Sequence, residues 1–259
     1  MDKLLKELRV VVTGAARGLG RTVVEGFLAA GARVHIGDVD ASALEAARTA
    51  LPDLGATVCD VADQDQVDQL FDEVRAGLGG LDVLINNAGI AGPTASMEAI
   101  EVADWMRTLA VDLTGSFLCA RRAVPLLKEA GGGSLINVSS AGGRFGYPLR
   151  SPYAAAKWGL IGFTQTLAME LGPFGVRVNA LCPGFVASER LDRVIAAKAV
   201  AQAVTPEAIR EGFLRLNSMH TFLPAAAIAN AILFLCSPAG AFISGQTLGI
   251  DGNLETLRV

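Results

Sequence analysis

Cysteine is scarce and widely spaced in this chain of 259 residues. The four cysteines are Cys59, Cys119, Cys182 and Cys236, and no two of them form a C-x-x-C pair. Such spacing predicts buried free thiols in a reducing compartment. The first seven residues also lack the apolar core of a secretory signal. These two absences together predict a cytoplasmic protein.

An excess of positive charge is absent as well. The formal net charge is −4, and lysine and arginine are scattered without a basic run. This balance argues against a nucleic-acid-binding surface. No cluster of histidine, cysteine and carboxylate side chains has the spacing of a metal site, so we expect no metal.

A long uninterrupted apolar segment is also missing. Residues 221–250 carry no formal charge, but Pro224 and Pro238 bracket their apolar helix. The bracketed stretch, residues 225–236, is well short of the roughly 20 residues that a membrane span needs. We therefore predict a buried helix followed by a core strand, and no membrane partner.

What the chain does contain is apolar sequence in short pieces, with 51% hydrophobic residues. That content is enough for a large core, and we expect one domain over residues 1–259. A β-branched run at 8–13 precedes a glycine-rich turn, an apolar helix at about 19–30 and a strand at 33–38. This is a βαβ unit, whose helix N-terminus is a natural seat for pyrophosphate.

The same alternation continues along the chain. Further strands are predicted at residues 56–61, 82–86, 134–140, 176–182 and 245–252. Helices are predicted at 63–78, 98–130 and 151–171, with shorter helical pieces within 189–222. Alternating strands and helices predict an α/β fold: a doubly wound, Rossmann-like sheet of seven parallel strands with helices on both faces.

The helix at 151–171 carries a pair with chemical potential. Ser151 predicts its N-cap, Pro152 its first helical position, and Gly172 its end. Tyr153 and Lys157 are four residues apart, so their side chains project from one face. An adjacent ammonium favours the phenolate form of tyrosine, which suits acid–base chemistry. The pair alone fits equally well a surface lysine one turn from a half-buried tyrosine.

Other motifs decide between these two interpretations. TGAARGLG stands at residues 13–20, NNAG at 86–89, INVSS at 136–140, YAAAK at 153–157 and PGFVAS at 183–188. In this order and spacing they resemble the short-chain dehydrogenase/reductase family, which shares TGxxxGxG, NNAG, a serine and YxxxK. The resemblance spans Leu8 to Gly252. It implies hydride transfer between NAD and a secondary alcohol or ketone.

The resemblance also implies roles for the catalytic residues. Tyr153 would be the general acid in reduction and the base in oxidation, with Lys157 assisting it and holding the nicotinamide ribose. Ser140, thirteen residues before the tyrosine, would position the carbonyl oxygen. Asp112 departs from the family, which usually has asparagine in this proton relay. A carboxylate there favours the charged lysine, and it leaves open a slower or inactive enzyme.

For the cofactor, the resemblance assigns the glycine turn to the pyrophosphate. Asp38 ends the second strand, where its carboxylate would accept hydrogen bonds from ribose hydroxyls and repel a 2′-phosphate, which favours NAD over NADP. Arg17 is the opposing signal, because family members that use NADP often carry a basic residue at this position. The remaining implied cofactor residues are Gly14, Gly18, Leu19, Gly20, Asp60, Val61, Asn87, Ala88, Gly89, Tyr153, Lys157, Val186 and Ser188.

The remaining expectations concern the lid, the assembly, the alternative functions and the substrate. Residues 189–222 would form a lid over the substrate, with most of its charges solvated, and the family implies a homotetramer. The alternatives are an NADPH-dependent ketoreductase similar to 3-oxoacyl reductases, or a catalytically impaired NAD-binding protein. The substrate does not follow from the sequence, because the family accepts sugars, polyols, steroids, acyl thioesters and small alcohols.

Overall fold

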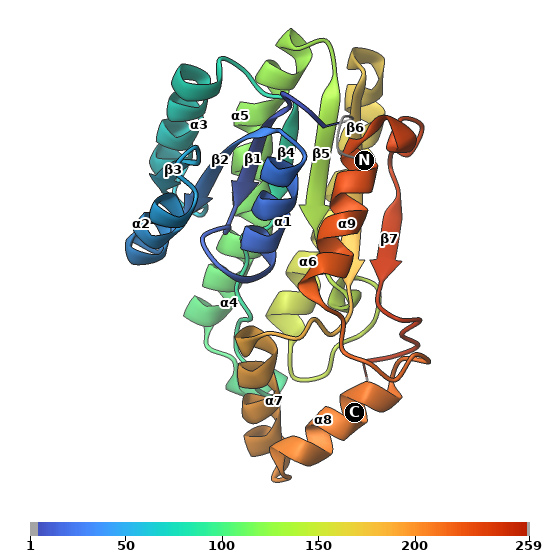
Figure 1. The fold of residues 1–259 in the computed structure, drawn as a ribbon. Helices are drawn as coiled ribbons and strands as arrows, with labels where there is room; N and C mark the ends of the chain where they lie inside the picture. Colours follow the sequence, from blue (N-terminus) through green and yellow to red (C-terminus); the bar gives the residue numbers. More distant parts are fainter. Residues whose placement is uncertain (1–4, 258–259) are drawn as a thin grey trace.

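The computed structural model describes residues 5–257, and a single parallel sheet of seven strands lies at its centre (Figure 1). The strands are β1 (Arg9–Thr13), β2 (Arg33–Asp38), β3 (Gly55–Val58), β4 (Val83–Asn86), β5 (Gly133–Val138), β6 (Val176–Pro183) and β7 (Thr247–Ile250). They lie in the order β3-β2-β1-β4-β5-β6-β7. Every neighbouring pair is parallel, which confirms the predicted doubly wound α/β fold.

Helices cover both faces of this sheet. One face carries α1 (Gly18–Ala29), α2 (Ala41–Ala50) and α9 (Ala225–Cys236), which share one apolar core with the strands. The other face carries α3 (Gln64–Leu78), α5 (Gly115–Glu129) and α6 (Ser151–Leu171), which share a second core. In β1, Val10 and Val12 belong to the first core and Val11 to the second. Alternate residues of a strand face opposite sides, so a strand covered on both faces is apolar throughout.

Two helices lie beyond the carboxyl ends of the strands (Figure 1). They are α7 (Glu189–Gln202) and α8 (Pro206–Arg215), close to the helical pieces that the sequence predicts. They enclose a small third core in which the rings of Phe185 and Phe213 stack with centroids 4.2 Å apart. This core attaches the two helices to the carboxyl-terminal edge of the sheet.

Three sequence predictions were wrong in detail. The helix expected at 98–130 is split into α4 (Val102–Leu109) and α5 by a π-helical turn at Ala110–Thr114. The N-cap of α6 is Arg150, and Ser151 is its first helical residue. β7 is a half-buried edge strand, because no further strand pairs with it in the described chain.

The predicted burial of the cysteines is confirmed. All four are free and buried, and burial raises the pKa of the Cys59 and Cys236 thiols to about 12. They are therefore inert, apolar core residues. Within residues 5–257, no helix combines the length and apolar character needed to cross a membrane.

Candidate active site

A cavity of about 840 Å³ opens at the carboxyl ends of the strands. The strand order reverses between β1 and β4, and in doubly wound sheets such a reversal creates a crevice for ligands. Every catalytic and cofactor residue assigned from the sequence lines this cavity, except Asp112. Motifs up to about 170 residues apart in sequence are therefore brought to one site.

The glycine turn between β1 and α1 forms one wall. Gly14 and Gly18 have positive φ angles of 62° and 56°, a region that favours glycine. A Cβ on Gly20 would lie 2.4 Å from the backbone oxygen of Gly14, so this position has no room for a side chain. α1 begins without a side-chain cap and without an acidic residue in its first turn, unlike α2, α3, α7 and α8, whose N-termini are capped by side chains. Its first amide groups are thus available to an anion.

The carboxylate of Asp38 is held rigidly at the end of β2. One oxygen accepts a hydrogen bond from the backbone N–H of Ala16 at 3.0 Å, and the other from that of Asp40 at 3.1 Å. The Arg17 guanidinium, which was the opposing cofactor signal, forms an ion pair with the Asp40 carboxylate. Side-chain hydrogen bonding to Ser42 is the largest of the effects that lower the pKa of Asp40. The negative charge at Asp38 is therefore fixed, and the positive charge at Arg17 already has a partner.

The residues after β3 and β4 form the floor. The Asp60 carboxylate pairs with Arg107 at 2.7 Å, and its backbone leads into Val61 at the cavity wall. The Asn87 side chain donates to the backbone oxygens of Thr13 and Gly14, so this amide ties the glycine turn to β4. This contact stabilises the junction between the glycine turn and β4.

Gly89 lies beside two charged side chains of the site. A Cβ there would lie 3.1 Å from the Asp112 carboxylate and 3.4 Å from the Lys157 ammonium. The missing side chain therefore leaves space for these two charged groups. Ala88 packs beside Gly14, whose own Cβ would lie 2.7 Å from the Ala88 Cα.

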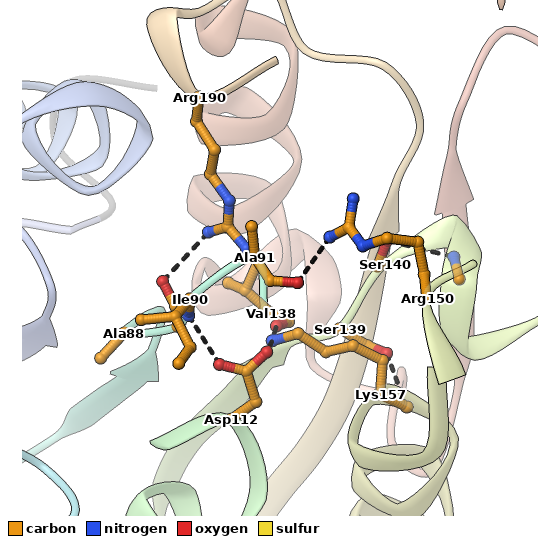
Figure 2. Close-up of polar contacts among 12 residues, drawn as sticks. Ala88, Ile90, Ala91, Asp112, Val138, Ser139, Ser140, Arg150, Lys157 and Arg190 are labelled. Carbon is orange, nitrogen blue, oxygen red and sulfur yellow. Dashed lines mark hydrogen bonds and ion pairs between the residues drawn. The ribbon is translucent and has the colours of Figure 1, made fainter. Parts of the chain in front are cut away.

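Tyr153 and Lys157 lie on the first turns of α6, facing the cavity. The Lys157 ammonium is 3% exposed; it donates to the Val138 backbone oxygen at 3.1 Å and lies 4.0 Å from the Asp112 carboxylate (Figure 2). Asp112 is fully buried and accepts a hydrogen bond from the Ile90 N–H at 2.7 Å. The π-helical turn brings this carboxylate beside the lysine.

Ser140 follows β5 and caps a short 3-10 turn. Its hydroxyl oxygen accepts a hydrogen bond from the Gly142 N–H at 3.1 Å, which leaves the hydroxyl hydrogen for another acceptor. A Cβ on Gly142 would lie 3.3 Å from the Tyr153 ring, so the serine turn packs against the tyrosine. Ser139, predicted to be structural, donates to the Lys157 backbone oxygen at 2.8 Å.

Val186 and Ser188 lie on the loop after β6. Ser188 caps α7 by accepting from the Leu191 N–H at 3.2 Å, and it donates to the Val186 backbone oxygen at 3.1 Å. Both residues line the cavity. The loop therefore connects the site to the helices that were predicted to form a lid.

Sequence analysis missed two buried cations at this site. Arg150 donates to the Ala91 backbone oxygen at 2.6 Å (Figure 2). Its guanidinium lies over the Tyr153 ring with 5.0 Å to the centroid. Lys198 was expected among the solvated charges of residues 189–222, but it is a buried residue of α7. No sequence signal distinguishes these two from exposed arginines and lysines, because their burial comes from packing between distant segments.

Arg190 adds a third cation near the tyrosine. It donates to the Gly89 backbone oxygen at 3.1 Å (Figure 2). Its guanidinium lies 5.8 Å from the Tyr153 ring centroid. Arg150, at the N-cap of α6, and Arg190, on α7, thus hold two carbonyl groups of the loop after β4. Tyr147 also lines the cavity and meets Tyr153 edge to face.

Comparison with known proteins agrees with this architecture. Residues 14–254 match the family model described as enoyl-(acyl carrier protein) reductase. The chain is 38% identical to cis-4-hydroxycyclohexanecarboxylate dehydrogenase from Sinomonas cyclohexanicum, over 97% of this chain and 98% of that protein.

Two solved structures have the same fold. One is an NAD⁺-bound xylitol dehydrogenase, with 25% identity, a TM-score of 0.93 and coverage of 96% of this chain and 99% of the other. The second is an actinorhodin polyketide ketoreductase variant with NADPH, with 27% identity, a TM-score of 0.91 and coverage of 95% and 96%. Given these matches and the motifs around the cavity, the chain belongs to the short-chain dehydrogenase/reductase family of NAD(P)-dependent oxidoreductases that act on CH–OH groups.

Proposed function

We propose that this enzyme interconverts a secondary alcohol and a ketone with NAD(H), using Tyr153 as the general acid and base. One observation carries the proposal. Ser140, Tyr153 and Lys157 line the same cavity as the glycine turn and the uncapped N-terminus of α1. Acid–base groups and a dinucleotide seat in one cavity are what hydride transfer to or from a carbonyl carbon requires.

In this mechanism the bound nicotinamide supplies or accepts the hydride. Tyr153 donates its phenolic proton to the carbonyl oxygen in reduction, and it takes the proton back in oxidation. Ser140 donates its free hydroxyl hydrogen to the same oxygen, because its own oxygen is occupied by the Gly142 N–H. The Lys157 ammonium stabilises negative charge at the tyrosine, and Asp112 and the Val138 carbonyl hold it in position.

The residues around the cavity fit a dinucleotide. The first amides of α1 would hold the pyrophosphate, with Gly14, Arg17, Gly18, Leu19 and Gly20 forming the turn. Asp60 and Val61 would contact the adenine, and Val186 and Ser188 the carboxamide of the nicotinamide. The ribose beside the nicotinamide would be held by Tyr153 and Lys157, with Asn87, Ala88 and Gly89 close to it.

We further propose that the cofactor is NAD and not NADP. Two backbone amides hold the Asp38 carboxylate where a 2′-phosphate would approach it, and the repulsion disfavours NADP. Arg17, the nearest cation on the turn, is paired with Asp40 and is not free to neutralise a phosphate. The competing proposal is an NADPH-dependent ketoreductase, which the NADPH-bound ketoreductase among the structural neighbours favours.

The relative that acts on cis-4-hydroxycyclohexanecarboxylate makes cyclic secondary alcohols the first substrates to test. Residues 189–222 would form the lid, since α7 contributes Arg190, Leu191, Arg193 and Val194 to the cavity. We also propose a cytoplasmic homotetramer. Support comes from the four free cysteines, typical of a reducing compartment, and from exposed apolar side chains such as Phe242 and Trp158, typical of interfaces.

The decisive experiment follows NADH and NADPH consumption by the purified protein over cyclic ketones, sugars and acyl thioesters. We expect turnover with NADH that is lost in Tyr153→Phe, while this variant still binds NADH. Exclusive use of NADPH with acyl thioesters would support the competing ketoreductase. Tight NADH binding without turnover on the whole panel would refute the proposal and leave a cofactor-binding protein impaired at Asp112.

A further inference from the structure

Arg150 and Lys198 are two buried cations that the proposed reaction does not use: Arg150 lines the cavity and lies over Tyr153, and Lys198, on α7, lies next to Tyr147 and Phe213. Arg150 is 3% exposed and Lys198 is 1% exposed. Removing a charged group from water is strongly unfavourable unless an opposite charge or hydrogen bonds compensate. Their hydrogen-bond and ion-pair partners therefore indicate whether these residues have a structural role or bind a ligand.

Their partners within residues 5–257 are too few. The Arg150 Nη2 donates to the Ala91 carbonyl, but its Nε and Nη1 have no hydrogen-bond acceptor among the described residues. The Lys198 Nζ also lacks a hydrogen-bond acceptor there, and no described carboxylate forms an ion pair with either residue. An isolated structural role would leave these charges uncompensated.

Aromatic rings supply the remaining contacts. The Arg150 guanidinium lies 5.2 Å from the Tyr147 centroid, and the Lys198 ammonium lies 5.7 Å from the same ring and 5.2 Å from Phe213. Arg150 also lies over Tyr153. Ring faces attract cations but carry no net charge, so they do not neutralise the guanidinium and the ammonium beside the Tyr147 ring.

The two cations also act against each other. Burial lowers the pKa of Lys198, and the positive charge of Arg150 lowers it further. Such a pair becomes favourable when an anion lies beside it, because the anion neutralises both charges. The site thus has the electrostatics of an anion-binding pocket next to the reacting tyrosine.

Both signs of charge line the cavity. Its acidic residues are Asp38, Asp40 and Asp60, at or just after the ends of β2 and β3, and Glu189 at the start of α7. Near Tyr153 the wall carries Tyr147, Arg150 and Arg190, together with the apolar Leu191 and Val194 of α7. An apolar wall with fixed cations suits a small carbon skeleton that carries a negative group.

We propose that Arg150, with the adjacent positive charge of Lys198, binds a carboxylate of the substrate, so that the enzyme acts on hydroxy acids and their keto acids. This inference rests on the proposed function, because it places the carboxylate beside the tyrosine that handles the proton. Guanidinium and ammonium groups form charge-assisted hydrogen bonds with carboxylates. The pair would hold one end of the substrate while Ser140 and Tyr153 meet the carbinol oxygen. The carboxylate also compensates the buried donors.

The test compares 4-hydroxycyclohexanecarboxylate with its methyl ester and its primary amide, with the cofactor present. For the wild type we expect kcat/KM for the acid to exceed that for either neutral analogue by about 10- to 100-fold, the value of hydrogen bonds to a charged group. Arg150→Gln and Lys198→Met should each remove most of this advantage, measured as the acid-to-ester ratio of kcat/KM, through a higher KM for the acid. Arg215→Gln, on the exposed surface of α8, is the matched control and should keep the full advantage.

Equal turnover of acid and ester by the wild type, or an unchanged acid-to-ester ratio in both variants, would overturn the proposal. If Arg150→Gln does not fold, Lys198→Met decides alone. Turnover of neutral alcohols without preference for the acid would refute the carboxylate site and leave the proposed function intact. Absence of turnover of every substrate by the wild type would instead refute the proposed function.

Direct binding provides an independent measurement. Calorimetry of cyclohexanecarboxylate with the protein and NAD should show binding that weakens about 10-fold or more in Lys198→Met. Absence of this effect would refute the carboxylate site even without turnover. Cyclohexyl phosphate is the comparison ligand, and tighter binding of this phosphate than of the carboxylate would contradict the assignment to carboxylic acids.

Discussion

The charge at Asp38 gives a quantitative prediction for cofactor choice. At 4 Å, two unit charges repel by about 1 kcal/mol in bulk water and by about 4 kcal/mol at an effective dielectric constant of 20. A 2′-phosphate carries a charge of about −1.5 to −2. Because Asp38 is held by two backbone amides at 3.0 and 3.1 Å, it cannot swing away from the phosphate. Partial exposure lowers the net penalty to about 2–4 kcal/mol, which corresponds to a preference for NADH of about 30- to 1,000-fold.

The perturbation is Asp38→Asn, which removes the charge and keeps one acceptor for the backbone amides. We expect the ratio of kcat/KM for NADH to that for NADPH to fall by at least about 10-fold, mainly through better use of NADPH. Steady-state rates with one ketone and both cofactors measure this ratio, and fluorescence titration measures cofactor binding directly. The exposed Asp53→Asn serves as the control for an equal change in net charge.

An unchanged ratio in Asp38→Asn would refute the electrostatic argument. A second variant examines the same reasoning from the other side. Asp40→Ala removes the partner of Arg17, and in the Asp38→Asn background it should improve NADPH binding further, because the guanidinium becomes available to the phosphate. Added salt should shrink each of these differences, since exposed charges are screened.

Three further predictions concern stability and the proton relay. The free energy of unfolding should fall by about 2 kcal/mol between pH 7.5 and 5, because burial lowers the pKa of His35 to about 4 while the unfolded chain takes up the proton near 6.5. Urea unfolding at both pH values measures this loss, and His35→Gln should reduce it. Gly20→Ala should lower Tm and abolish the thermal shift with NADH, since its Cβ would meet backbone at 2.4 Å, whereas Gly77→Ala on α3 should be neutral or stabilising. Asp112→Leu should lower kcat by 100-fold or more, because it leaves the buried Lys157 ammonium without its ion-pair partner. Asp112→Asn should keep measurable activity. Equal activity of Asp112→Leu and the wild type would contradict a role for this ion pair.

Much of the fold was predictable because its signals are local. Strand β2 begins and ends at the predicted residues, Arg33 and Asp38, and α6 ends at Leu171 before the predicted stop at Gly172. Both depend on the apolar period and on glycine in the neighbouring residues. The break in the helix predicted at 98–130, by contrast, involves a contact with a distant part of the chain. In the π-helical turn, Asp112 accepts a hydrogen bond from the Ile90 N–H, and Ile90 lies in the loop after β4.

The motifs also identified the candidate site, since four of them stand at the carboxyl ends of strands, which a parallel sheet brings to one edge, and YAAAK lies on the first turns of α6. Tyr153, Lys157, Ser140 and the glycine turn could thus be named from residue types and spacing alone. What only the tertiary structure decided is the charge environment around them. Arg150 and Lys198 are ordinary loop and helix residues in the sequence, and they become buried cations because α7 packs over the loop that precedes α6. Burial depends on contacts between distant segments, so the sequence determined the chemistry of the reacting groups, and the packing of α7 determined the charge that a substrate would meet.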